Sequence, residues 1–263
     1  MSEASVVLSH PAPHVIQVAI NRPEAKNAID EKTRVALIDA ITTGLNDSDV
    51  RALLLCGTNG IFCAGGDLAS MRDMTEQAAR TRMQSGHHLI KLLWYANIPI
   101  VVAMEKFAIG AGAGLALVAD HIVAGESTRM SFPFLQLGLV PDWGSTQSLI
   151  RKAGWGTAKR LVLDCASLKG RELLDLGLVE QVVADDSVMD VAADKALEFS
   201  RLPRLALRQF KEAMRRSTQN IDAALAAEED DQTACFLNEE FKEGLSALKQ
   251  KRAPNFFSDV SDE

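Results

Sequence analysis

Two turns rich in small residues are the places in this sequence where backbone groups could do chemistry. The first contains Gly65 and Gly66 and follows the apolar segment 51–57, for which we expect a strand. The second contains Ala111, follows the apolar segment 99–104 and opens an apolar helix. Glycine lets the chain turn with positive φ or approach a ligand atom without a Cβ in the way. Each segment alone is also typical of an ordinary tight turn.

Together the two turns could supply two convergent N–H donors. The first N–H groups of a helix are unpaired and carry partial positive charge. Two such donors aimed at one oxygen stabilise negative charge that develops only during a reaction, and losing one typically costs about 100- to 1,000-fold in rate. The glycines of segment 110–114 lack the spacing of a dinucleotide-binding fingerprint. The sequence therefore favours stabilisation of an oxyanion over binding of a nucleotide cofactor of that type.

Four blocks of the sequence resemble those of the enoyl-CoA hydratase/isomerase (crotonase) superfamily. They follow one another in the family's order and spacing, and they are residues 21–28, 62–68, 110–120 and 137–142. The resemblance runs from about Val15 to Phe256. It implies an α/β spiral of repeated ββα units over residues 1–187, followed by a helical C-terminal region, residues 188–263, that forms homotrimers or homohexamers.

Hydrophobic periodicity on its own predicts an α/β body followed by a helical tail. Short apolar runs and helical spacing alternate through the first two-thirds of the chain, with strands expected at 14–20, 51–57, 99–104 and 121–125 and helices at 31–45 and 75–94. The last third has helical spacing with almost no strand signal, over 188–201, 204–216, 221–237 and 239–251. Pro203 separates the first two of these helices and Pro254 closes the last.

The resemblance also implies where an acyl-CoA substrate lies. The backbone N–H of Gly66 would be the first oxyanion donor and that of Ala111, where many relatives have glycine, the second. Coenzyme A, as part of the substrate and not a separate cofactor, would be held mostly through backbone groups, at Ala25, Lys26, Ala28, Ala64, Gly65, Asp67 and Leu68. Trp143, Met71 and Met74 are candidates for the acyl pocket, and Phe256 would pack near the adenine.

Some of these residues have a second interpretation. Asp67 is also suited to cap the helix that begins near Leu68. Lys26 and Arg22 are available for the phosphates of coenzyme A. So are Lys249, Lys251 and Arg252, although these three are equally typical of the solvated cationic end of a helix.

The residues that would move a proton depart from the hydratase pattern. The two glutamates that hydratases use would stand at Gly114 and Phe134, and neither residue is acidic. Asp142 falls where some monofunctional enoyl-CoA isomerases and the ring-opening epoxyphenylacetyl-CoA isomerases carry their acid/base carboxylate. One carboxyl group can remove a proton from C2 and return one to C4, which moves a double bond from C3 to C2.

The residues around Asp142 suggest that its carboxylate is buried. They are apolar, namely Phe134, Leu135, Leu137, Leu139 and Trp143, and burial raises the pKa of an aspartate toward neutral pH. The other interpretation is that Asp142 only caps a turn after Pro141.

The favoured function is therefore an enoyl-CoA isomerase that works through an enolate. Three alternatives stay open: an enoyl-CoA hydratase with an unrecognised second acid, an epoxyphenylacetyl-CoA isomerase, and a non-catalytic acyl-CoA-binding subunit in which Asp142 is structural. The first two would share the oxyanion hole, and the third would need only the binding residues.

Composition excludes several other classes of protein. The 263 residues carry a net charge of −7, which argues against a nucleic-acid binder because phosphate neutralisation needs clustered Lys and Arg. No apolar run reaches the roughly 18 residues of a membrane span, and the N-terminus lacks the pattern of a signal peptide. The four cysteines form no CxxC pair and have no histidine at metal-ligand spacing. We expect a cytoplasmic protein without a metal site.

Overall fold

The computed structural model describes residues 4–71, 75–216, 232–235 and 237–257 of the chain. Strands and helices alternate through the first two-thirds, as the sequence predicts, so the α/β class is confirmed. The chain falls into two compact units, residues 1–197 and 198–263. The predicted domain boundary between residues 187 and 188 remains a prediction. None of the described helices combines the length and the apolar character needed to cross a membrane.

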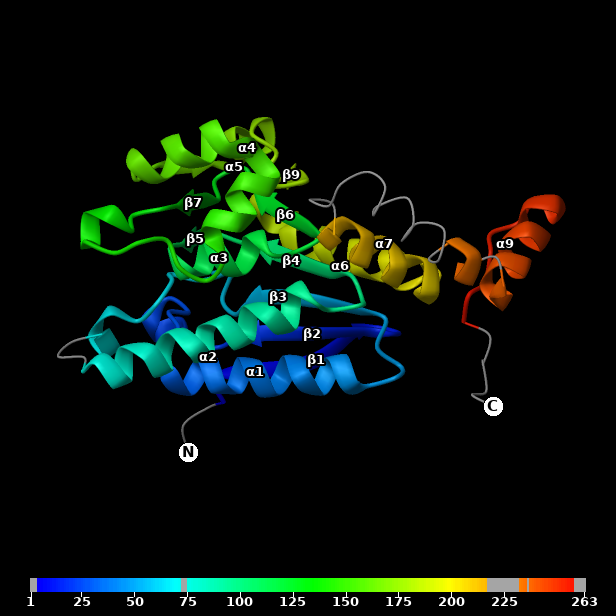
Figure 1. Ribbon diagram of the computed structural model, residues 1–263, viewed down its shortest axis with the longest axis horizontal. Helices are drawn as coiled ribbons and strands as arrows, with labels where there is room; N and C mark the ends of the chain where they lie inside the picture. The colour runs from blue at the N-terminus through cyan, green and yellow to red at the C-terminus, as the bar shows by residue number, and fades with distance from the viewer. Residues whose placement is uncertain (1–3, 72–74, 217–231, 236, 258–263) are drawn as a thin grey trace. The chain divides into compact units, whose positions relative to one another are not determined.

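A six-stranded sheet forms the centre of the first unit (Figure 1). Its strands, in spatial order, are β1 (Val6–Ala12), β2 (Val15–Ile20), β3 (Ala52–Gly57), β4 (Ile100–Met104), β6 (His121–Gly125) and β9 (Gln181–Val183). β1 pairs with β2 antiparallel, and every other neighbouring pair is parallel. Every residue of β3 and β4 is buried, which explains why both are continuous apolar runs in the sequence.

A second, three-stranded sheet produces the repeating unit of the fold. It consists of β5 (Phe107–Ile109), β7 (Arg129–Ser131) and β8 (Ser167–Lys169), with β5 parallel to β7 and β7 antiparallel to β8. β4 is followed by β5 and α3 (Ala111–Leu117), and β6 is followed by β7 and, after a turn of 3₁₀-helix, α4 (Ser145–Leu163). Each turn therefore places one strand in each sheet before its helix, as expected for a spiral of ββα units.

Two long helices cover one face of the larger sheet. α1 (Glu31–Asn46) and α2 (Glu76–Trp94) lie side by side (Figure 1). Each begins with a side-chain cap, because Asp30 accepts a hydrogen bond from the N–H of Thr33 and Thr75 accepts one from Ala78. α5 (Gly170–Asp175) and α6 (Val188–Ser200) complete the helices of this part of the chain.

The described residues of the second unit contain helices and no strand. α7 (Arg204–Arg216) and α9 (Glu239–Gln250) match the helices predicted at 204–216 and 239–251. The helix predicted at 188–201 corresponds to α6. Most of the helix predicted at 221–237 lies outside the described residues, as does Met74.

Candidate active site

The two small-residue turns lie against each other. Gly65 has a φ of 95°, and a Cβ there would stand 2.4 Å from the carbonyl oxygen of Ile109 and 3.7 Å from the nitrogen of Ala111. Only glycine allows both this φ and this close approach. A parallel bridge between Cys63 and Ala108 joins the same two segments. The sequence predicts the two turns separately, and the fold brings them together.

The N–H groups of Gly66 and Ala111 make no hydrogen bond within the described part of the chain. Ala111 is the first residue of α3, and its φ is negative. Its N–H is therefore one of the first N–H groups of a helix, which have no acceptor within the helix. That both N–H groups point at one oxygen remains a prediction.

Asp142 lies in the loop before α4, and its backbone, not its side chain, caps the turn. The carbonyl oxygen of Asp142 accepts hydrogen bonds from the N–H of Ser145 at 2.9 Å and from its Oγ at 2.6 Å. Oδ1 of Asp142 is buried and has no hydrogen-bond partner in the described part of the chain. Oδ1 therefore does not serve the capping role that the sequence left open.

Burial raises the pKa of Asp142 above its ordinary value, as the sequence predicts. The positive charges of Arg82 and of His87 oppose this shift, as does a hydrogen bond from the residue's own backbone. A raised pKa favours a carboxyl group that both accepts and returns a proton during a reaction.

The predicted apolar surroundings of Asp142 are only partly correct. Phe134 and Trp143 are buried, with exposed fractions of 5% and 4%. Leu135, Leu137 and Leu139 are instead exposed at 43%, 52% and 45%. They belong to a turn of 3₁₀-helix and the loop after it, which present these side chains to solvent. The apolar sequence around Asp142 therefore overstates how deeply these three leucines are buried.

The loop that carries Asp142 fills the space beside Gly114. A Cβ on Gly114 would lie 2.6 Å from Oγ of Ser145 and 2.9 Å from the carbonyl oxygen of Trp143. A glutamate at this position would collide with that loop. The ring of Phe134 lies close to Gly110, the residue before α3. A Cβ on Gly110 would stand 3.8 Å from the nearest ring carbon of Phe134. The hydroxyl of Ser145 and the backbone of Trp143 thus fill the space beside Gly114, and Phe134 contributes an apolar ring beside Gly110.

Replacing Gly114 by alanine is expected to destabilise the protein, although alanine is the better helix former. Overpacking of this kind typically lowers the free energy of unfolding by about 1–3 kcal/mol. Gly156 of α4 is a matched control, because a Cβ there meets no atom within 4 Å. Urea denaturation should show a lower free energy of unfolding for Gly114→Ala than for the wild type, and no decrease for Gly156→Ala. Equal stability of the two variants would contradict the packing that we describe.

Hydrogen bonds join the two N-terminal blocks that the resemblance assigns to coenzyme A. The N–H of Ala64 donates to the carbonyl oxygen of Lys26 at 3.1 Å. The N–H of Ile29 donates to the carbonyl oxygen of Gly65 at 2.8 Å. The N–H of Asp67 donates to the carbonyl oxygen of Ile29 at 3.0 Å. Ala25, Ala28 and Leu68 belong to the same two segments, and the side chain of Leu68 is 57% exposed. Their contacts with a ligand remain a prediction.

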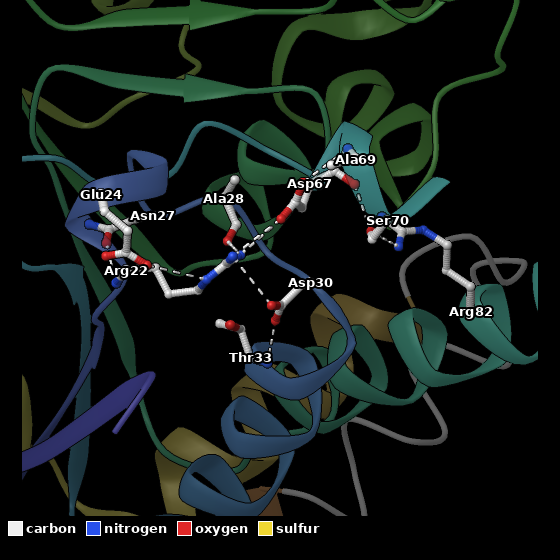
Figure 2. A network of polar contacts seen from close by, with 10 residues as sticks. All are labelled: Arg22, Glu24, Asn27, Ala28, Asp30, Thr33, Asp67, Ala69, Ser70 and Arg82. Carbon is white, nitrogen blue, oxygen red and sulfur yellow. Dashed lines mark hydrogen bonds and ion pairs between the residues drawn. The ribbon is translucent and has the colours of Figure 1, made fainter. Parts of the chain in front are cut away.

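The side chain of Arg22 connects these two blocks through hydrogen bonds and ion pairs (Figure 2). Its guanidinium donates to Oδ2 of Asp67 at 3.2 Å and to the carbonyl oxygen of Ala28 at 2.7 Å, and it pairs with Asp30 at 3.3 Å. Oδ1 of Asp67 accepts from the N–H of Ala69 at 3.0 Å, so the predicted capping by Asp67 is confirmed. Because these partners occupy Arg22, the suggestion that it is available for phosphates is wrong. Lys26 is exposed.

The second unit holds the remaining predicted residues. Phe256 lines a hollow of 280 Å³ together with residues of α7 and α9, and its place beside an adenine remains a prediction. Arg252 forms hydrogen bonds to both carboxylate oxygens of Glu243, at 2.6 and 2.8 Å. It is therefore occupied within this unit and is not a ready phosphate ligand.

Sequence reasoning missed Arg82 of α2. Its Nη1 donates to Oγ of Ser70 at 3.1 Å, and its Nη2 lies 2.8 Å from the point where a Cβ on Gly66 would stand. The helical spacing of Arg82 with the buried residues Gly86, Leu89 and Leu93 was a usable signal, because it places the arginine on the inner face of α2.

Comparisons with known proteins agree with this architecture. A family model described as enoyl-CoA hydratase/isomerase matches residues 12–259. The chain is 33% identical over 243 residues to the 2,3-dehydroadipyl-CoA hydratase of Escherichia coli (strain K12), covering 92% of this chain and 94% of that protein. It is 32% identical over 255 residues to the 1,2-epoxyphenylacetyl-CoA isomerase of the same strain, covering 95% and 97%. The crystal structure of an enoyl-CoA hydratase from Bacillus anthracis matches with a TM-score of 0.92 at 26% identity, covering 97% and 100%.

Proposed function

This chain belongs to the enoyl-CoA hydratase/isomerase family, and from that premise we propose that it is an acyl-CoA isomerase that moves a double bond from C3 to C2 of an enoyl-CoA. One observation carries the proposal. Oδ1 of Asp142 is the only carboxylate oxygen in the described residues that is buried without a hydrogen bond, and neither Gly114 nor Phe134 can exchange a proton. The site thus has one candidate acid/base where hydration would need two.

The reaction follows from the groups at the site. The carboxylate of Asp142 removes a proton from C2, and the negative charge moves to the thioester oxygen. The N–H groups of Gly66 and Ala111 donate hydrogen bonds to that oxygen and stabilise the enolate. The same carboxyl group then delivers its proton to C4. The backbone of the two joined N-terminal blocks holds the coenzyme A portion of the substrate.

Similarity to the 1,2-epoxyphenylacetyl-CoA isomerase supports a second candidate reaction. That relative and the hydratase relative are nearly equally similar to this chain, at 32% and 33% identity. Opening an epoxide would use the same oxyanion donors and a single acid/base. The lack of space beside Gly114 argues against the hydratase alternative.

Assays of the purified protein with three substrates separate these reactions. We expect conversion of 3-enoyl-CoA to 2-enoyl-CoA and little or no hydration of 2-enoyl-CoA. Faster hydration than isomerisation would contradict the proposal, and turnover of 1,2-epoxyphenylacetyl-CoA alone would favour the second candidate. Binding of acyl-CoA without any turnover would identify a non-catalytic subunit.

We also propose that the protein is cytoplasmic and assembles as a homotrimer or homohexamer. The helical content of the described residues after 188 supports the assembly, since the family resemblance assigns this region to subunit contacts. Light scattering at micromolar concentration should give a mass of three or six chains, and a strictly monomeric species would refute this proposal.

A further inference from the structure

Trp143, the residue after Asp142, packs tightly against two helices, and at each contact the helix carries a glycine. Trp143 is buried, with an exposed fraction of 4%. Its indole ring lies against Gly86 of α2, since a Cβ on Gly86 would stand 2.7 Å from Nε1 and 3.1 Å from Cε2 of the ring. Its backbone lies against Gly114 of α3, since a Cβ on Gly114 would stand 2.9 Å from the carbonyl oxygen of Trp143. Neither helix has room for a side chain where it meets this residue.

The backbone at Trp143 adopts a conformation that is unfavourable for a bulky residue. Its φ is 49°, in the left-handed region, and the next residue, Gly144, has a φ of 72°. A bulky side chain in this region is rare, and the conformation persists only where the surrounding structure holds it in place. The carbonyl oxygen of Asp142 accepts two hydrogen bonds from Ser145, which close the same turn. The turn after Asp142 is therefore held by these hydrogen bonds and by the packing of the tryptophan.

The packing of Trp143 determines where Asp142 lies relative to α2 and α3, because the two residues are bonded to each other. α3 begins with Ala111, one of the two proposed oxyanion donors. α2 carries Arg82 and His87, whose positive charges act on the carboxyl group of Asp142. A shift of the tryptophan would therefore move the carboxylate relative to all three groups. Because Trp143 is only 4% exposed, it has little surface left for contact with an acyl chain.

We propose that Trp143 is a positioning residue, which fixes the carboxylate of Asp142 relative to the oxyanion donor at the start of α3 and does not itself form a wall of the acyl pocket. The inference rests on the proposed function, because it takes Asp142 as the acid/base. A misplacement of about 1 Å between reacting groups can cost about 100-fold in rate. The groups proposed to bind coenzyme A belong to other segments. Disturbing the tryptophan should therefore lower kcat and leave the affinity for acyl-CoA nearly unchanged.

Two substitutions disturb this packing from opposite sides of the contact. Trp143→Leu removes the ring atoms that face Gly86, and Gly86→Ala pushes against the same atoms without changing the loop. Each should lower kcat for 3-enoyl-CoA by about 10- to 100-fold. In the double variant the leucine leaves room for the new methyl group, so the two losses should not multiply. Trp143→Phe keeps an aromatic ring and should retain most of the turnover.

Gly156→Ala is the matched control, because it makes the same exchange in α4 where a Cβ meets no atom within 4 Å. This variant should keep the wild-type kcat. Circular dichroism checks that each variant is folded, and titration with butyryl-, hexanoyl- and octanoyl-CoA gives the affinity. An unchanged kcat in folded Trp143→Leu and Gly86→Ala would show that the tryptophan only packs. A loss of affinity that grows with chain length would instead place it in the acyl pocket. Either result would overturn the inference.

An NMR titration of the Asp142 carboxyl group tests the inference without turnover. Its ¹³C resonance is identified by its absence from Asp142→Asn, and in the wild type it should titrate above the ordinary pKa of an aspartate. In Trp143→Leu and Gly86→Ala the pKa should move toward the ordinary value, because a loosened turn admits water, whereas Gly156→Ala should leave it unchanged. If the wild type does not convert 3-enoyl-CoA, the isomerase function fails and this titration alone decides. An unchanged pKa in both variants would then overturn the inference.

Discussion

Asp142→Asn is expected to lower isomerase turnover by about 100-fold or more, the usual range for a general acid/base. Asparagine keeps the shape of the side chain but can neither accept nor deliver the proton. The affinity for a saturated acyl-CoA should change little, because the binding groups are elsewhere. Steady-state kinetics and a binding titration on the same preparation separate the two effects. Near-normal turnover would show that another group moves the proton, and His87 would be the first to examine.

The same substitution should stabilise the fold near neutral pH. Burial raises the pKa of Asp142 in the folded protein, so the protonated form is the one that folding favours. The stability contributed by protonation is fully present below the unfolded pKa and is lost as the pH rises through the higher folded pKa. Asparagine cannot ionise and escapes this loss. The Tm of Asp142→Asn should therefore exceed that of the wild type near pH 7, and the difference should shrink as the pH falls toward 3.8.

Gly66→Pro is expected to lower turnover by about 100- to 1,000-fold, because proline removes one of the two proposed oxyanion donors. No protein hydrogen bond is lost, since the N–H of Gly66 has no acceptor among the described residues. A Cβ at this position would lie 2.5 Å from the terminal methyl of Met71 and 2.8 Å from Nη2 of Arg82, the far ends of two long side chains. Gly66→Ala shares that contact but keeps the N–H, which makes it the matched control.

The comparison of the two variants isolates the donor. Proline also restricts Gly65, whose φ is 95°, so the fold of each variant needs to be checked by its circular dichroism and by binding of a coenzyme A product. If both variants are folded, the turnover of Gly66→Pro should be far lower than that of Gly66→Ala. Equal turnover of the proline and alanine variants would remove Gly66 from the oxyanion hole.

The elements predicted from the sequence are those with enough residues to show a period. β3 and β4 are fully buried apolar runs, and α1 and α2 each repeat their buried face over several turns. β5, β7 and β8 have three residues each, too few for an alternating pattern. No residue of β1 is fully buried, in keeping with its place at the edge of the sheet, and so it lacks the apolar face that marks a strand.

The site itself depended on contacts that no local pattern contains. The turns at Gly65 and Ala111 are recognisable in the sequence, but their meeting follows from the pairing of Cys63 with Ala108. The role of Gly114 is also nonlocal, since the atoms that exclude a side chain there belong to Trp143 and Ser145. Composition near Asp142 was misleading for a related reason. Neighbouring leucines in a sequence need not be neighbours in space, and three of them are exposed.

Proton transfer in heavy water tests the central claim most directly. If the carboxyl group of Asp142 carries the proton from C2 to C4, wild-type protein acting on 3-enoyl-CoA should place deuterium at C4 of the product, at a level set by exchange of that carboxyl proton with solvent. Mass spectrometry and NMR of the product locate and quantify the label. Asp142→Asn should give essentially no labelled product over the same time. Deuterium at C4 formed by the asparagine variant at the wild-type rate would contradict a mechanism with Asp142 as its single acid/base.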